Sequence, residues 1–285
     1  MTSTTWGWLI AIYLLLGGVS AGAAVIHGYN GISKMFGERI HRASGFLAPF
    51  PVMAGLLLLI FDLHRPSKFY KLMFNYNFTS VMSWGVLLLG VFTIVSLWSM
   101  YLVYRGKEAP RGIYILNVIL GLGVGGYTGL LLSAISSNPL WGTHALPILF
   151  LVSALSTGIA GTLLVGHFLD SSHSDEEAKL EKTDRVLLVL EITVLLAVIL
   201  GWAYAPKGDL ALKALLTGTY GLLFWLGFIL IGLVIPFVLL WRKSQGNTGK
   251  NFTILIASMV LFGGALLRII VVFAGQSIYP GLGIY

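Results

Sequence analysis

Eight apolar runs of about 20 residues each dominate the chain and leave only short loops between them. A helix of about 20 apolar residues crosses a hydrocarbon layer roughly 30 Å thick, and in lipid only helices and closed barrels satisfy their backbone polar groups. We therefore expect an all-α integral membrane protein with eight transmembrane helices, folded as one polytopic domain over residues 1–285. The predicted spans are Trp6–Ile26, Ala43–Phe61, Ser80–Tyr104, Gly112–Ala134, Thr143–Phe168, Val186–Ala205, Leu212–Leu240 and Phe252–Ala274.

Composition excludes several other classes of protein. Hydrophobic residues make up 57% of the chain and charged residues only 10%, too few charges to solvate a soluble domain. There is no cysteine, which excludes disulfides, iron–sulfur ligation and C-x-x-C-H haem attachment within this chain. Any redox chemistry must then use a diffusible cofactor or a partner's clusters. The first apolar run lacks a preceding Lys or Arg, so we expect a retained span rather than a signal peptide.

The basic residues predict the orientation in the membrane. Twelve of the eighteen Lys and Arg residues lie in the loops after the first, third, fifth and seventh spans, and five lie on the opposite side. Because basic loops stay in the cytoplasm, both termini should face outward from a bacterial or archaeal cytoplasmic (inner) membrane. We attribute the sequence pI near 9.6 to these loops and expect no nucleic-acid partner. The acidic segment "DSSHSDEEAKLEKTDR" should be a solvated cytoplasmic connection with some helical pairing.

Polar residues from five predicted helices gather within roughly 10 Å of the outer surface, judged from helix rise and bilayer thickness. They are Tyr13, Asp62, Ser83, Tyr127 and Arg268. An arginine within a span faces the protein interior and needs a partner, and Asp62 is the expected counter-ion by depth. Tyr13 is equally well explained as an interfacial belt residue. Tyr127 lies in a glycine-rich span suited to close packing, so it should point into the bundle.

Two further features allow more than one interpretation. Glu191 lies about 9 Å inside the sixth span, where it is either a proton relay or a group that hydrogen-bonds to a neighbouring hydroxyl. His27 and His167 end the first and fifth spans at the cytoplasmic face, and two facing imidazoles would be needed to hold a b haem. Because histidines at loop edges are more often not ligands, we do not expect haem.

Several segments together resemble the NrfD-type membrane subunits of polysulfide reductase-like complexes. They are "WGWLIAIYLLLGGVSAGA", "DLHRPSKF", "MSWG", "YTGLLLSAISSNPLW" and "LLRIIVVFAGQ", and they are spread in order over the whole chain. The resemblance implies a quinone (menaquinone or ubiquinone) bound near the periplasmic side of a first four-helix half, residues 1–134, with a second half over residues 143–274. It also implies a ferredoxin-like iron–sulfur partner and, in many complexes, a molybdopterin catalytic subunit.

Carried over by position, the resemblance assigns the quinone site to Tyr13 and Tyr127, with Asp62, His64 and Arg65 at its rim. Some family members have Asn and His where this chain has Ile10 and Tyr13, so the contacts to the quinone head group can differ.

The residues themselves favour the same place, because a quinone needs an apolar slot, a few donors and a route for protons. Tyr13, Tyr127 and His64 could donate to its carbonyls, with Ser83 at the same depth. Protons could reach the site through Asp62 or His64 from outside, or through Glu191 and Arg268 from the cytoplasm. Three basic residues lie on the outer side, where topology does not require them: Arg65, Lys68 and Lys71. A role at the rim of the site and in the docking surface for the partner would explain their presence.

A plain helix stop at Pro66 is the alternative interpretation of this segment, but a stop alone does not call for Asp, His and Arg together. Two other functions remain open, a secondary transporter and a purely structural membrane anchor. A transporter would place its polar groups at the midplane, at helices interrupted in inverted repeats. An anchor would leave Glu191 and Arg268 unexplained.

Overall fold

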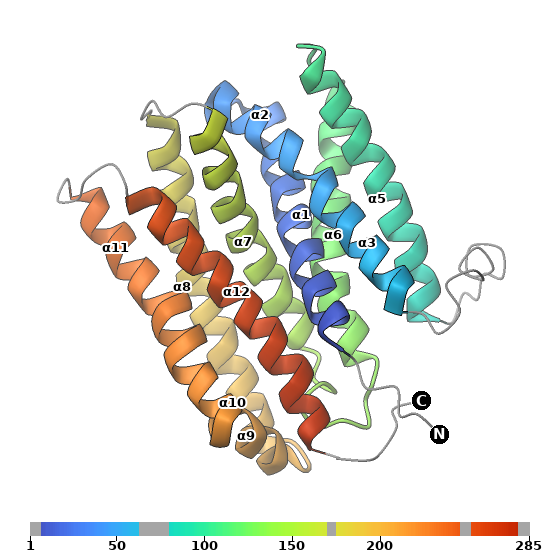
Figure 1. Ribbon diagram of the computed structural model, residues 1–285, viewed down its shortest axis with the longest axis vertical. Coiled ribbons are helices and arrows are strands. Elements are labelled where there is room, and N and C mark those ends of the chain that lie inside the picture. Colours follow the sequence, from blue (N-terminus) through green and yellow to red (C-terminus); the bar gives the residue numbers. More distant parts are fainter. Residues whose placement is uncertain (1–6, 63–79, 170–174, 246–251, 279–285) are drawn as a thin grey trace.

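The computed structural model describes residues 7–62, 80–169, 175–245 and 252–278, and within these residues it contains helices and turns but no strand. Eight helical segments are long and apolar enough to cross a membrane. The predicted all-α membrane fold with eight spans is confirmed. Figure 1 shows the helices running side by side along one axis.

Single helices form six of the spans, and two spans are built from shorter pieces. The helices are α1 (Trp8–Ser33), α2 (Gly37–Leu47), α3 (Pro49–Asp62), α5 (Val81–Tyr104), α6 (Arg111–Ser133), α7 (Leu146–Leu169), α8 (Asp175–Tyr204), α9 (Gly208–Leu216), α10 (Gly218–Leu222), the π-helix η2 (Leu223–Val234), α11 (Ile235–Ser244) and α12 (Phe252–Ser277). The second span joins α2 to α3, and the seventh joins α10, η2 and α11.

The predicted boundaries are wrong at the start of the sixth span and at the start of the seventh span. The helix α8 begins at Asp175, eleven residues before the predicted Val186, because its first turns are polar and escape a hydropathy criterion. The seventh span begins at Gly218 and not at Leu212. Thr217 is extended and Gly218 has φ of +65°, which breaks the helix after the short α9. Glycine is suited to this left-handed backbone because it has no Cβ.

Helices α1 and α7 lie in the middle of the bundle and touch backbone to backbone (Figure 1). A Cβ built on Gly158 would lie 2.4 Å from the Cα of Gly22, so only small residues allow this approach. Helix α1 also packs against α6 and α3, and α7 packs against α12 and α8. Because α1 and α7 belong to different predicted halves and share a close contact, the division into two four-helix halves stays a prediction.

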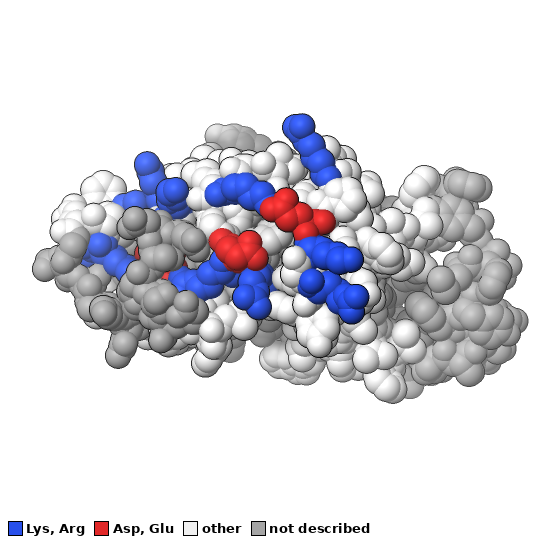
Figure 2. Space-filling model, turned by 90° about the horizontal axis from the view of Figure 1, so that it is seen from above, with Lys and Arg blue, Asp and Glu red and all other residues white. Residues whose placement is uncertain are grey.

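The two ends of the bundle differ in charge. At one end, here called the terminal face, α1 begins and α12 ends (Figure 1). The opposite end, here called the basic face, holds the links α1–α2 and α5–α6 and the start of α8. Figure 2 shows Lys and Arg side chains spread over the basic face, with acidic groups among them. There the Lys34 Nζ lies 2.5 Å from a carboxylate oxygen of Glu108, a bond that raises the pKa of Lys34 and lowers that of Glu108.

Two side chains fasten the α6–α7 loop to α12 at the terminal face. The Asn138 amide donates to the Gly275 carbonyl at 2.8 Å, and the Trp141 indole donates to the Val271 carbonyl at 2.7 Å. Both donors are buried, so these bonds satisfy groups that would otherwise be costly in a membrane protein. The loop therefore joins the ends of α6 and α7 to the end of α12 at the terminal face.

Candidate functional site

Tyr13 and Tyr127 are both buried near the terminal face. Tyr13 has no exposed surface, and its hydroxyl has no hydrogen-bond partner among the described residues. The Tyr13 ring packs toward α3, where a Cβ on Gly55 would lie 3.1 Å from it, while the Tyr127 hydroxyl lies directly against Gly85 of α5. The two tyrosines are close enough to interact electrostatically. Tyr13 therefore faces the bundle interior and is not a lipid-facing belt residue.

The other predicted quinone-site residues lie at the same end or outside the described part. Ser83 is buried in the first turn of α5. Asp62 is the last residue of α3, and its backbone alone is described. The four remaining predicted residues of the rim and docking surface fall outside the described ranges: His64, Arg65, Lys68 and Lys71. The structure thus brings Tyr13 and Tyr127 together, with Ser83 at the same end.

Arg268 is fully buried in α12 and is held by α1, by α7 and by a carbonyl of its own helix. Its Nε donates to the Leu14 carbonyl at 3.1 Å, and its Nη1 donates to the Ser153 hydroxyl at 3.2 Å and to the Gly264 carbonyl at 2.7 Å. The guanidinium carbon also lies 5.5 Å from the centre of the Phe150 ring. The predicted need of this arginine for interior partners is confirmed.

Glu191 is the carboxylate that interacts with Arg268 in the described structure. Its side chain is buried in α8 and hydrogen-bonds to Ser153, which in turn accepts from Arg268. The expected pairing of Arg268 with Asp62 rested on depth alone, and the Asp62 side chain lies outside the description. The structure unites Glu191 and Arg268, two residues that the sequence singled out separately.

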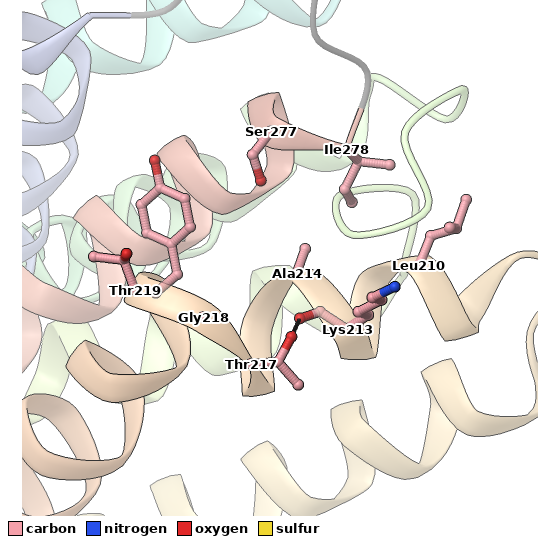
Figure 3. A pocket seen from close by; sticks show the side chains of 9 residues that line it. Leu210, Lys213, Ala214, Thr217, Gly218, Thr219, Ser277 and Ile278 are labelled. Atoms are coloured by element: carbon pink, nitrogen blue, oxygen red, sulfur yellow. Dashed lines mark hydrogen bonds between the residues drawn. The ribbon is translucent and has the colours of Figure 1, made fainter.

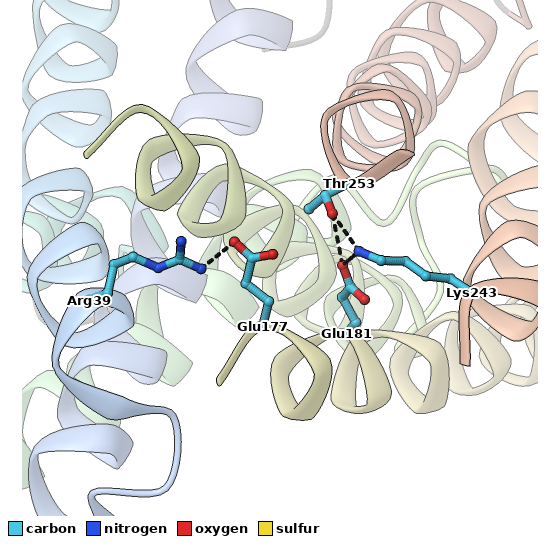
Figure 4. Close-up of polar contacts among 5 residues, drawn as sticks. All are labelled: Arg39, Glu177, Glu181, Lys243 and Thr253. Carbon is cyan, nitrogen blue, oxygen red and sulfur yellow. Dashed lines mark hydrogen bonds and ion pairs between the residues drawn. The ribbon is translucent and has the colours of Figure 1, made fainter. Parts of the chain in front are cut away.

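In its described part, which begins at Asp175, the acidic segment before the sixth span is not a solvated connection, contrary to the sequence prediction. From Asp175 onward it is the first part of α8, and three of its carboxylates are buried: Glu177, Glu181 and Asp184. Figure 4 shows Glu177 paired with Arg39 of α2 and Glu181 bonded to Lys243 and Thr253. These carboxylates lie on the buried side of α8, where polar side chains of neighbouring helices bind them.

The sequence did contain a signal for this arrangement. Together with Glu191 these residues occupy positions 177, 181, 184 and 191, a helical i, i+4, i+7, i+14 spacing that places them on one face. The interleaved Lys179, Lys182 and Arg185 made the segment look evenly charged. We refer to Glu177, Glu181, Asp184 and Glu191 as the α8 stripe.

His27 lies in a compact cluster at the basic face. Its ring stacks on that of His41, with centroids 4.3 Å apart, and its Nδ1 lies 3.1 Å from the His41 carbonyl oxygen. The His41 Nε2 is 3.3 Å from the Tyr114 hydroxyl. His167, the other histidine considered for haem, is part-exposed at the end of α7 and packs edge-on against Phe168. The residue that faces His27 is therefore His41, which the sequence had not indicated.

A cavity of about 360 Å³ opens at the terminal face, between α9, α10 and the end of α12. Its walls carry polar side chains, among them Lys213, Thr219, Tyr220 and Ser277 (Figure 3). A quinone needs a largely apolar slot for its tail, and the predicted quinone-site residues are not among those that line this cavity. Buried polar groups, rather than this cavity, therefore mark the candidate site.

Comparison with known proteins identifies relatives along almost the whole chain. The model of the family described as "Polysulphide reductase, NrfD" matches residues 1–280. A polysulfide reductase chain of Wolinella succinogenes is 37% identical, over 96% of this chain and 95% of the relative. Protein NrfD of Escherichia coli is 34% identical, over 96% of each chain. A selenate reductase subunit of Mesobacillus selenatarsenatis is 24% identical, over 86% of this chain and 68% of the relative.

Proposed function

Because the chain belongs to the NrfD family of integral inner-membrane proteins, we propose that it is the quinone-reactive membrane subunit of a multisubunit oxidoreductase. In this role it exchanges electrons between the quinone pool (menaquinone or ubiquinone) and an iron–sulfur subunit docked on the terminal face. Another subunit, of the molybdopterin type, converts the terminal substrate. The names of three relatives support a place in a redox complex: a polysulfide reductase chain, a selenate reductase subunit and a menaquinol oxidoreductase subunit.

The observation that carries the proposal is the Tyr13 hydroxyl, which is buried without a partner among the described residues. A buried hydroxyl without a partner is costly, so a native structure normally gives it a water or a ligand. A quinone carbonyl is an acceptor that fits this donor, and Tyr127 and Ser83 lie at the same end of the bundle. The apolar groups of α1 and α3 around the Tyr13 ring suit the rest of the molecule.

The proposed orientation places the basic face in the cytoplasm and both termini outside. Asp62 and His64 then border the site on its outer side. Arg65, Lys68 and Lys71 contribute positive charge to the surface on which the iron–sulfur subunit docks. Electrons cross between the partner's cluster and the quinone at the terminal face. Quinone reduction binds two protons with the two electrons, and quinol oxidation releases them.

Protons move to or from this site past Asp62 on the outer side and past Glu191 and Arg268 on the inner side. Asp62, at the end of α3, can hold a proton between the site and outer water. Glu191 can hold a proton deep in the bundle, and Arg268 is the fixed cation that orients it. Arg268 also bonds to the carbonyl of Leu14, the residue after Tyr13, so it connects α8 with the proposed site.

The proposal is tested by Tyr13→Phe in the assembled complex. The change removes a hydroxyl that bonds to no described residue, so folding and assembly should be unaffected. The affinity for a naphthoquinol analogue should fall about 2- to 13-fold, the value of one hydrogen bond of about 0.5–1.5 kcal/mol. Tyr101→Phe, at an exposed position of α5, is the matched control and should leave quinol binding as it is. Equal quinol affinity in Tyr13→Phe and wild type would remove Tyr13 from the site.

A further inference from the structure

We propose that the α8 stripe is a proton route between the basic face and the quinone site, and that the Asp184–Ser156 pair is its critical step. The inference rests on the proposed function, because it supplies the protons that quinone chemistry requires. Of the four stripe residues, Glu191 alone belongs to the proton path predicted from the sequence, which also included Arg268 and Asp62.

The stripe extends from the surface into the middle of the bundle. Glu177 and Glu191 are fourteen residues apart, which is about 21 Å along a helix. All four carboxyl groups are buried, and each contacts a different set of neighbours from α2, α7, α11 or α12. Carboxyl groups inside a membrane helix are costly and usually serve ion or proton transfer.

The part of the stripe nearest the basic face is paired with cations. Glu177 forms an ion pair with Arg39, and Glu181 accepts from the Lys243 ammonium at 2.5 Å and from the Thr253 hydroxyl at 3.2 Å. These pairs lie at the basic face, where α2, α11 and α12 meet the start of α8 (Figure 4). Glu181 is thus anchored at the basic face and lies within electrostatic reach of Asp184, about one turn deeper in the bundle.

Asp184 is bound differently from these two residues. It is 1% exposed, and the Ser156 hydroxyl donates to its Oδ1 at 2.7 Å. The other groups that act on it in the described structure are carboxyls, those of Glu181 and Glu191. One hydroxyl and two carboxyl groups stabilise the negative charge of a buried carboxylate poorly. The surroundings of Asp184 therefore fit a carboxyl group that gains and loses a proton better than they fit one half of a structural ion pair.

Two serines of α7 carry the connection inward. Ser156 bonds to Asp184, and Ser153 bonds to Glu191 and accepts from Arg268. They are three residues apart, about 4.5 Å along one face of α7, a gap that one water can bridge. A hydroxyl donates and accepts at the same time, so it can pass a proton without holding a charge.

At its end farthest from the basic face, the stripe connects to α1 through Arg268, which bonds to Leu14 beside the proposed site. The Nη2 of Arg268 has no partner among the described residues, and it faces Gly18, where a Cβ would lie 2.5 Å away. An unsatisfied guanidinium donor at a position without a side chain calls for a water molecule. Such a water would lie between Arg268 and the α1 segment that carries Tyr13, and it would extend the route toward the quinone site.

The test uses the whole complex in sealed liposomes, with the basic face inside. The lumen contains a pH-sensitive dye, naphthoquinol is the donor, and ferricyanide outside is the acceptor. Each quinol gives two electrons to two ferricyanide ions and releases two protons. Direct oxidation of quinol by ferricyanide releases its protons outside, so lumen acidification reports only protons that leave through the stripe. Valinomycin with potassium prevents a membrane potential from opposing the flow.

We expect wild type to acidify the lumen as ferricyanide is reduced. Asp184→Asn and Ser156→Ala should lose this acidification per electron, down to the passive leak, and Asp184→Glu should restore it. Two control variants should keep the wild-type ratio. Thr157→Val removes an α7 hydroxyl that bonds only to carbonyls of its own helix, and Glu38→Gln removes an exposed carboxylate of the basic face.

The outcomes separate this inference from the proposed function. If Asp184→Asn and Ser156→Ala both acidify the lumen as wild type does, or if wild type oxidises quinol without lumen acidification, the stripe is structural and the quinone site stands. A wild-type complex that does not oxidise naphthoquinol contradicts the proposed function itself. Should Asp184→Asn not assemble, Ser156→Ala decides, because Ser156 contributes one hydrogen bond in the described structure.

Discussion

Replacing Arg268 by Gln should destabilise the protein by about 3–5 kcal/mol, because it leaves the buried Glu191 carboxylate without its cation. Arg268 has no exposed surface and Glu191 is 2% exposed, so water cannot take the place of the lost charge. The substitution also removes hydrogen bonds to Leu14, Ser153 and Gly264, of which a glutamine can restore one.

Adding Glu191→Gln should recover part of this loss. The double variant lacks both of these charges, so its cost is that of two missing hydrogen bonds, about 1–3 kcal/mol at 0.5–1.5 kcal/mol each. The two substitutions should therefore be strongly non-additive, with a favourable coupling of about 2 kcal/mol, within the range shown by residues of one hydrogen-bond network.

The assay is unfolding by SDS in mixed micelles, followed by tryptophan fluorescence for wild type, both single variants and the double variant. Arg268→Gln combined with Glu38→Gln is the control, because Glu38 is exposed on α2 at the basic face and should add to Arg268→Gln within about 0.5 kcal/mol. If Arg268→Gln and Glu191→Gln add as independently as the control pair does, the two groups do not interact through the buried network described above.

Four further tests address the site, the docking surface, the topology and the packing. Tyr127→Phe should leave assembly intact and slow quinol turnover about 2- to 13-fold, the value of one lost hydrogen bond; unchanged turnover would exclude its hydroxyl from the site. Gly18→Ala should lower the SDS midpoint because its Cβ meets the Arg268 guanidinium, whereas Gly17→Ala, with only an ordinary contact, should gain about 0.5–1 kcal/mol; a gain in both would mean that Arg268 moves freely. In intact cells, an impermeant maleimide should label Ser137→Cys but not Ser33→Cys, and the reverse would invert the topology. Changing Arg65, Lys68 and Lys71 together to Gln should release the iron–sulfur subunit at lower salt. Undiminished co-purification of that subunit would place docking elsewhere.

The eight spans could be predicted from the sequence because the free energy of insertion depends on local composition. About 20 apolar residues form a span wherever they occur in the chain. Helix ends were less predictable, since a helix continues beyond the hydrocarbon as long as its polar residues find partners. The first turns of α8 are an example, because their carboxylates bind Arg39 and Lys243 from helices distant in sequence.

The candidate site was predictable in depth but not in lateral position. Helix rise places Arg268 and Glu191 along the membrane normal, yet it cannot say which helices are neighbours. Depth therefore favoured Asp62 as the partner of Arg268, whereas the packing of α7 against both α12 and α8 brings Ser153 and Glu191 to it. The sequence also could not predict that the Tyr13 hydroxyl has no hydrogen-bond partner among the described residues, because this depends on which acceptors the neighbouring helices place beside it.

The α8 stripe escaped notice because a membrane reverses the usual pattern of an amphipathic helix. In water the charged face of a helix points outward, so a segment rich in Glu, Asp and Lys reads as solvated. In lipid the outward face must be apolar and the polar residues turn toward the other helices. Leu188 and Leu195 share the buried face with the carboxyls, while Val186, Leu190 and other apolar residues point away from it. Wherever an acidic segment runs without a break into a span at helical spacing, the side that faces the protein is therefore the place to look for a route for ions or protons.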